Sequence, residues 1–306
     1  MDHPFIKCLE ERILVVDGAM GTSVYAHDLS VEADYRGCEN CPEILNDSRP
    51  DVVEQIHHRF LEVGADCIET NTFGANKIVL GEFQLEDRTR ELNRLAAEIA
   101  RRAVEKFSLP NAPRFVLGSM GPGTKLPSLG HATFDVLWDS YAEQARGLLD
   151  GGVDAFIIET CQDILQAKTA ICGATDAMRE VGREIPIICQ MTIEVTGTML
   201  VGTEIAAALA ALEAFPQVQI IGINCATGPQ EMSEHVRYLG QHCRRMISVV
   251  PNAGLPQLVD GKTHYALTPD ELARHLREFV ITDGVNLVGG CCGTTPEHIA
   301  AVHAAV

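Results

Sequence analysis

The sequence predicts a single (β/α)8 barrel, a TIM barrel, over residues 1–306, and three observations support this fold. Short apolar segments recur eight times, and each is followed by a longer amphipathic stretch. Hydrophobic residues make up 46% of the chain but aromatic residues only 5%, so the core is expected to be aliphatic, as in parallel sheets covered by helices. No Gly-x-Gly-x-x-Gly follows the first apolar segment, which argues against a doubly wound dinucleotide-binding sheet.

The apolar segments are predicted to be strands, because short continuous apolar runs are typical of strands that are buried on both faces. Each run ends in small or polar residues, as in ILVVDGAMG at the first position. In chain order the eight segments occupy residues 13–21, 65–74, 114–123, 154–163, 186–194, 218–228, 246–254 and 284–294.

The amphipathic stretches are predicted to be helices, and several begin with helix-start signals. Pro50 opens one of them, and Thr268 and Thr295 each precede a proline. The segments at 22–48 and 122–133 are predicted to be the longest loops, and long loops in compact domains are often functional. The predicted helices occupy residues 49–63, 86–107, 134–150, 163–180, 203–214, 229–241, 269–280 and 296–305.

Charge and cysteine content restrict the class of protein. With 42 acidic and 24 basic residues the formal net charge is −18, which would repel a phosphate backbone and excludes nucleic acid as a partner. The first residues lack the apolar centre of a signal peptide, and no run of about 18 apolar residues predicts a membrane span. Eleven cysteines without an export signal predict reduced thiols, so we expect a cytoplasmic protein.

Three cysteines lie where predicted strands end, which is the edge that holds the active site in such barrels. Cys225 ends the sixth strand, and the adjacent Cys291 and Cys292 end the eighth. Adjacent thiols can reach one metal only where the strand has stopped alternating its side chains, and the flanking glycines permit that turn. Three thiolates at one edge favour tetrahedral Zn²⁺ with an open fourth position, which could hold a substrate thiol as a thiolate.

Carboxylates and glycines near this edge leave alternatives open. Asp17 and Glu159 end the first and fourth strands and could pair with a substrate ammonium, but a hydrogen bond at the barrel rim is an equal alternative. The cysteine pair alone could be structural, and the glycines after the last two strands could instead hold a phosphate. A phosphate site would need only backbone N–H groups and would leave two thiols without a role.

Seven motifs occur in order along essentially the whole chain. Together they resemble the homocysteine S-methyltransferase family, and they are closer to the N-terminal homocysteine-binding module of cobalamin-dependent methionine synthases than to the betaine or S-methylmethionine branches. The motifs are DGAMGT (17–22), ETNTFGAN (69–76), GPGTKLPSLGH (121–131), IETCQD (158–163), GINCATGP (222–229), PNAGLP (251–256) and GGCCGTTP (289–296).

The resemblance implies a zinc-bearing barrel that transfers a methyl group to the sulfur of L-homocysteine to give methionine. It implies that Cys225, Cys291 and Cys292 are the zinc ligands. It also implies that Asn252 lies beside the metal and occupies the fourth position until homocysteine displaces it.

The substrate contacts follow from the same resemblance. It implies that Asp17 and Glu159 hold the substrate ammonium, and that backbone groups around Gly18 and Phe73 lie near the substrate carboxylate. The folate, cobalamin and activation modules of a full methionine synthase do not follow in this sequence. We therefore expect an excised module or a free-standing enzyme, with methylcobalamin on another domain or corrinoid protein as the methyl donor.

Three rival functions remain open. One keeps the reaction but takes the methyl group from betaine, S-methylmethionine or another small donor. The second is a non-catalytic thiol module that stores zinc or senses oxidants through the adjacent cysteines. The third is a phosphate-binding barrel lyase, which should bind inorganic phosphate and no zinc.

Two further features carry no functional prediction. Cys38 and Cys41 form a C-x-x-C pair in the loop after the first strand, where a solvated pair is expected. His57 and His58 share their helix with Glu54, which predicts a solvated face.

Overall fold

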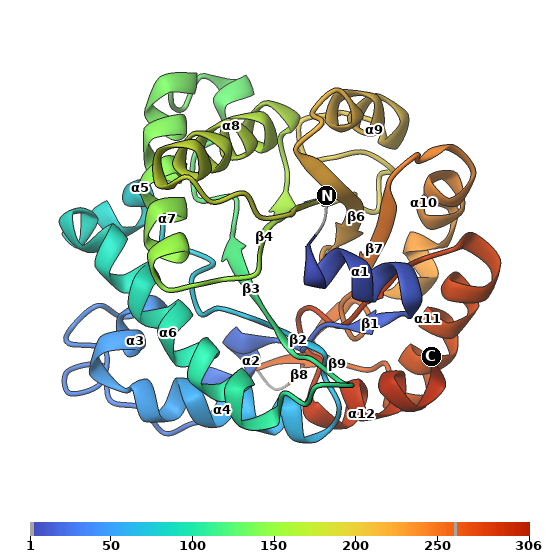
Figure 1. The fold of residues 1–306 in the computed structure, drawn as a ribbon, viewed down its shortest axis with the longest axis horizontal. Coiled ribbons are helices and arrows are strands. Elements are labelled where there is room, and N and C mark those ends of the chain that lie inside the picture. Colours follow the sequence, from blue (N-terminus) through green and yellow to red (C-terminus); the bar gives the residue numbers. More distant parts are fainter. Residues whose placement is uncertain (1–2, 260–261) are drawn as a thin grey trace.

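The computed structural model describes residues 3–259 and 262–306 and confirms the predicted barrel. Eight parallel strands form one sheet in the order β1-β10-β7-β6-β5-β4-β3-β2. A bridge between Val16 and Cys67 brings the two outer strands together, so the sheet is a nearly closed barrel. Helices surround it on the outside (Figure 1).

Each of the eight predicted strands is present. All are shorter than the apolar segments, because the last residues of each segment leave the sheet and form the loops at its carboxyl edge. The strands are β1 (Leu14–Val15), β2 (Cys67–Glu69), β3 (Phe115–Met120), β4 (Ala155–Cys161), β5 (Ile187–Met191), β6 (Val218–Asn224), β7 (Met246–Val250) and β10 (Leu287–Val288).

The eight predicted helices are present as well. Thr268 forms a capping box with Glu271 at the start of α11, as its position before a proline indicates. No helix in the described ranges is long and apolar enough to cross a bilayer. The helices are α4 (Pro50–Glu62), α6 (Thr89–Phe107), α7 (Phe134–Asp150), α8 (Ile164–Val181), α9 (Ile205–Glu213), α10 (Pro229–His242), α11 (Pro269–Asp283) and α12 (Pro296–Ala305).

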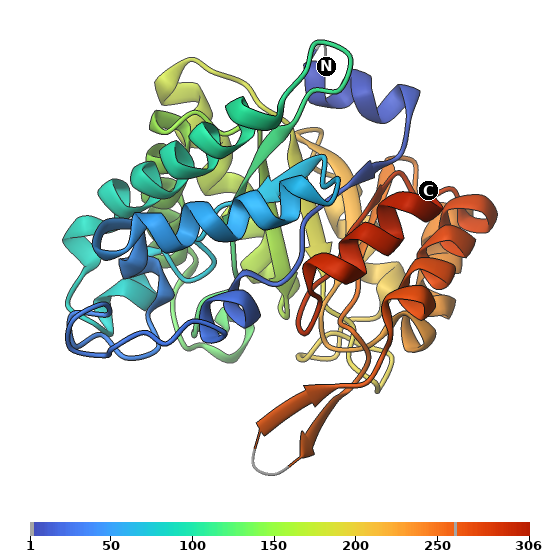
Figure 2. The ribbon, with the colours of Figure 1, turned by 90° about the horizontal axis from the view of Figure 1, so that it is seen from below.

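Several short elements were not predicted, and most of them are too short to show a clear period. Part of the predicted loop at 22–48 is helical, which corrects that prediction. A hairpin follows β7 and projects from the end of the barrel opposite α1 (Figure 2). The additional elements are α1 (Pro4–Glu11), α2 (Met20–Tyr25), η1 (Pro42–Ile44), α3 (Leu45–Ser48), α5 (Lys77–Gly81), η2 (Glu86–Arg88), η3 (Pro127–Leu129), β8 (Pro256–Val259) and β9 (Lys262–Tyr265).

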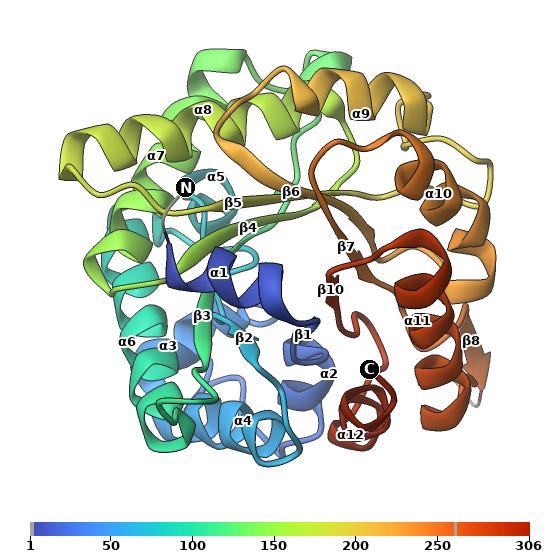
Figure 3. The same cartoon turned by 45° about the vertical axis from the view of Figure 1, so that its right-hand side comes forward.

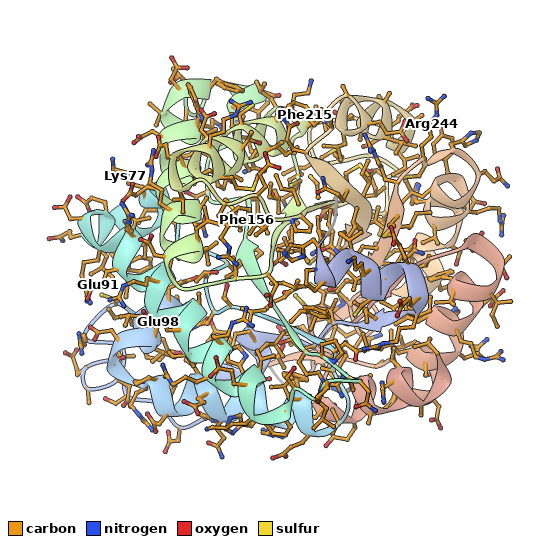
Figure 4. The ribbon with its side chains drawn as sticks, viewed as in Figure 1. Lys77, Glu91, Glu98, Phe156, Phe215 and Arg244 are labelled. Carbon is orange, nitrogen blue, oxygen red and sulfur yellow. The ribbon has the colours of Figure 1, made fainter. Side chains whose placement is uncertain are left out.

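The amino end of the barrel is closed by α1, which lies across the sheet in Figures 1 and 3. Its apolar residues Phe5, Ile6 and Leu9 pack against side chains from the strands, and the rings of Phe5 and Phe115 meet edge to face at 5.3 Å. Charged side chains such as Arg244 extend outward from the helical layer in Figure 4. The carboxyl end is therefore the open end of the barrel.

Candidate active site

The three predicted thiols converge at the carboxyl end. Cys225 directly follows β6, while Cys291 and Cys292 follow β10 after two glycines. The Sγ atom of Cys292 lies 3.9 Å from that of Cys225 and 4.0 Å from that of Cys291. Thiolates bound tetrahedrally to zinc at about 2.3 Å lie about 3.8 Å apart. The spacing of the sulfur atoms therefore fits one zinc ion, and in the described ranges no other group of three potential ligands meets.

The backbone is strained at the end of β6, in the turn that places the Cys225 thiol at the site. Cys225 has φ = 59° and Ala226 has φ = 58°, values in the left-handed region that non-glycine residues seldom adopt. Asn224 supports this turn, since its Oδ1 accepts from Thr160 N at 2.8 Å and its Nδ2 donates to Thr160 Oγ1 at 2.9 Å. Thr160, with φ = 55°, is strained in the same way at the end of β4. Strain of this kind is typical of functional sites.

The Cys291–Cys292 turn is held by hydrogen bonds on both sides. Cys291 N donates to Pro251 O at 2.8 Å, and Thr294 Oγ1 donates to Cys291 O at 2.7 Å. A Cβ at position 290 would overlap Thr294, so glycine is required there. Since β10 ends at Val288, the two cysteines are free of strand alternation and both thiols can face Cys225.

Asn252 lies behind the thiols. It is buried, and its Oδ1 accepts the Cys292 N–H at 3.0 Å, so it fixes the position of that cysteine. Asn252 is not among the residues that line the cavity described below. Its approach to the metal stays a prediction.

A cavity of about 240 Å³ opens beside the thiols. Gly18, Phe73 and Glu159 line it together with the three cysteines, so the structure brings these predicted residues into one site. A Cβ at Gly18 would lie 2.8 Å from the Phe60 ring and from Thr294 Oγ1, which explains the glycine. In the described part of the chain, no lysine, arginine or histidine lines this cavity.

Half-buried Glu69 and buried Glu159 line the cavity, and no cationic side chain of the described residues lines it with them; the predicted Asp17 is buried beside Glu69 but does not itself line the cavity. Asp17 accepts the Glu69 N–H at 3.2 Å, and burial raises the pKa of Asp17 well above its usual range. Burial also raises the pKa of Glu69 well above its usual range and that of Glu159 to about 7. Ser119 Oγ donates to Glu159 Oε1 at 2.5 Å. An ammonium group is the ligand chemistry that such an uncompensated cluster favours.

Three residues of this site were missed by sequence reasoning. Glu69 and Ser119 lie at or near strand ends, and that position was the one signal available for them. Tyr265 comes from the unpredicted hairpin, and its ring lies against Gly293, next to Cys292. A Cβ at Gly293 would overlap the Tyr265 ring, so this turn and the hairpin fit closely.

Two predictions made outside the site are wrong. His57 is fully buried on α4 rather than solvated, because it lies on the face that packs against the barrel. Cys41 is also buried, with its Sγ 3.6 Å from Glu43 Oε2, so Cys38 and Cys41 are not a solvated pair. No disulfide joins cysteines of the described ranges.

Comparison with known proteins agrees with this geometry. A family model described as homocysteine S-methyltransferase matches residues 14–306. The methionine synthases of Mycobacterium tuberculosis (strain ATCC 25618 / H37Rv) and Mycobacterium leprae (strain TN) are each 53% identical over 305 residues, covering 100% of this chain and 25% of those proteins. The chain thus spans only a quarter of the length of these relatives.

Solved structures show the same fold. The metallated form of the homocysteine methyltransferase MmuM from Escherichia coli has a TM-score of 0.79 at 22% identity, covering 99% of this chain and 100% of that chain. Its oxidized form has a TM-score of 0.77, also at 22% identity, and covers 100% of both chains. At this identity the likeness is evidence of fold alone.

Proposed function

The chain belongs to the homocysteine S-methyltransferase family, and from that premise we propose that it methylates the sulfur of L-homocysteine to give methionine. The proposed metal ligands are the Sγ atoms of Cys225, Cys291 and Cys292. The observation that carries the proposal is the convergence of these atoms, all within 4.8 Å of one another, beside a cavity with uncompensated carboxylates.

The protein's own residues supply a prepared thiol site. Zinc there would have one open position and would keep a bound substrate thiol deprotonated at neutral pH. Asn252, through the Cys292 N–H, and Asn224, through Thr160, hold the sulfur atoms in place before any ligand arrives. Positioning of the substrate sulfur against a methyl carbon is then the main contribution of the chain to catalysis.

The substrate amino group would bind the carboxylates. Glu159 lines the cavity, and Asp17 lies behind Glu69, so an ammonium entering the cavity meets a cluster with no competing protein cation in the described part of the chain. Backbone N–H groups near Gly18 and Phe73 are the proposed partners of the substrate carboxylate. The two ends of homocysteine would thus be fixed while its sulfur faces the thiols.

Methylcobalamin on another domain or protein is the proposed methyl donor. The methionine synthases that resemble this chain are about four times as long, which leaves room for a donor-carrying domain in them. In that transfer the substrate sulfur would bond to the methyl carbon, the donor would keep the electron pair of the bond it loses, and the thiol proton would pass to solvent. Betaine or S-methylmethionine is the alternative donor.

Methyl transfer by the purified zinc-loaded chain tests this proposal. We expect methionine from L-homocysteine and methylcobalamin, and none from betaine or S-methylmethionine in the absence of a corrinoid. Turnover with betaine or S-methylmethionine alone would show that this small molecule, and not methylcobalamin, is the methyl donor. A protein that holds zinc but neither binds homocysteine nor forms methionine would instead be a zinc or redox thiol module.

A further inference from the structure

Glu43 is a buried carboxylate of the cavity wall to which the proposed chemistry gives no role. It lies in η1 and is only 4% exposed. Its Oε1 accepts the Gly74 N–H at 2.6 Å, and Cys41 Sγ lies 3.6 Å from its Oε2. Burial raises the pKa of Glu43, which favours its uncharged form. A hydrogen bond to the backbone is therefore its main interaction at the site.

That hydrogen bond fixes one particular peptide group. The Phe73–Gly74 peptide donates through its N–H to Glu43 and accepts through its C=O from Gly121 N at 3.0 Å. A Cβ at Gly74 would lie 2.7 Å from Glu43 Oε1, so glycine is what allows this close approach. The peptide is thus held at both edges.

A second contact ties the same two segments together. Asn46 Nδ2 donates to Asn71 O at 2.8 Å, and Asn71 Nδ2 donates to Pro42 O at 2.8 Å. Residues 42–46 and 71–74 therefore form a clamp with two attachment points. Both segments contribute residues to the wall of the cavity.

The clamp matters because no cationic side chain of the described residues lines the cavity to bind a carboxylate. Backbone N–H groups of the wall can do so, and within the described ranges the Phe73 N–H has no acceptor. We propose that Glu43 is a positioning residue, which holds the Phe73–Gly74 peptide so that the neighbouring Phe73 N–H meets the substrate carboxylate. The inference rests on the proposed function, since the ligand is taken to be homocysteine.

The test compares two thiols on the full zinc-loaded chain by calorimetry. L-homocysteine carries the carboxylate, whereas 3-aminopropane-1-thiol has the same thiol and amine without it. Glu43→Leu should weaken homocysteine binding about tenfold. This is the order expected when the charged substrate carboxylate loses one hydrogen bond. Binding of 3-aminopropane-1-thiol should stay within twofold. Glu43→Gln should restore homocysteine affinity, because its amide oxygen can accept the Gly74 N–H.

Gly74→Ala changes the other partner of the same hydrogen bond and replaces Glu43→Leu if that variant does not fold. It should also weaken the binding of homocysteine but not that of 3-aminopropane-1-thiol. Glu39→Leu, an exposed position in the same loop, is the control and should change neither affinity. Zinc content and the unfolding midpoint should match the parent in every variant compared.

Equal weakening of both thiols, unchanged homocysteine binding in Glu43→Leu, or a Glu43→Gln variant as weak as Glu43→Leu would each overturn the inference. These outcomes differ from failure of the proposed function. In that case the parent chain itself would not bind homocysteine, and the inference would fall with it.

Discussion

The two ends of the barrel bury carboxylates in opposite ways. At the amino end, Asp66 is 1% exposed and is fully paired. Arg12 reaches both of its oxygens at 3.0 Å, Arg114 hydrogen-bonds to Oδ1, and Val15 N donates to Oδ2 at 3.0 Å. Every partner of this charge belongs to the chain, so the group serves the fold.

At the carboxyl end, Asp17, Glu69 and Glu159 are held without a cation from the described residues. Burial without a partner destabilises the charged form of each carboxyl group, and this raises its pKa. The comparison teaches that the kind of residue does not decide its role. A carboxylate whose partners are complete stabilises the fold, whereas one that lacks a partner is available for a ligand.

Removing the Asp66 carboxylate from the amino end should cause the largest loss of stability among the variants considered. Asp66→Ala leaves two arginines partly buried without a counter-charge, and we expect the free energy of unfolding to fall by about 3–5 kcal/mol. Chemical denaturation at neutral pH measures the loss. Homocysteine affinity of the folded variant should equal that of the parent. A loss below about 1 kcal/mol would show that this pairing contributes little.

Neutralising Glu159 should have the opposite effects: homocysteine affinity should fall while stability is kept. Glu159→Gln removes a carboxylate that the substrate ammonium needs, so homocysteine affinity should fall about 10- to 100-fold, or about 1.4–2.7 kcal/mol. Stability should not decrease, since an uncompensated charge is removed. Glu194→Gln, near the end of β5 but outside the cavity wall, is the control for calorimetry and should bind like the parent. A less stable Glu159→Gln with unchanged affinity would contradict the contrast between the two ends.

His57 is a third buried group, on helix α4 between the two ends, and neither of its ring nitrogens has a hydrogen-bond partner among the described residues. It tests how burial of an ionisable group without a partner affects stability. Burial lowers the pKa of His57 to about 3, so in the folded state the ring stays neutral far below the usual pKa of about 6.5. Above that value neither state is protonated, and this group contributes nothing to pH dependence. As the pH falls below it, only the unfolded state takes up the proton, and stability should drop by about 1.4 kcal/mol per pH unit until about pH 3.

Denaturation of His57→Leu over this pH range isolates that contribution. The variant should lose this part of the acid sensitivity, while His264→Gln, at an exposed position of the hairpin, should keep it. Identical pH profiles for His57→Leu and the parent would show that another group is responsible.

The strands, helices and thiols could be predicted from the sequence because their signals are local. A buried strand shows as an apolar run, and Cys225, Cys291 and Cys292 are marked by their positions at strand ends. The contact of Glu43 with Gly74 could not be predicted, because it joins two loops that carry no period. The β8–β9 hairpin was missed for the same reason, whereas α1 was missed although its buried residues Phe5, Ile6 and Leu9 stand at helical spacing.

The wrong prediction for His57 was avoidable. Val53, Ile56, Phe60 and Leu61 surround it at the spacing of one helical face, and all four are buried. That spacing places His57 on the same face. Glu54, the charged neighbour that suggested solvent exposure, lies at the edge of this face and is itself only partly exposed.

Zinc stoichiometry of protein purified anaerobically with reductant tests the central claim most directly. The parent and Cys243→Ala, which changes a cysteine outside the site, should each hold about one zinc per chain, as expected for a single three-thiolate centre. Cys225→Ala should hold little. A reduced parent that takes up no zinc when the metal is offered, or a Cys225→Ala variant that retains it, would contradict a zinc centre shared by β6 and β10.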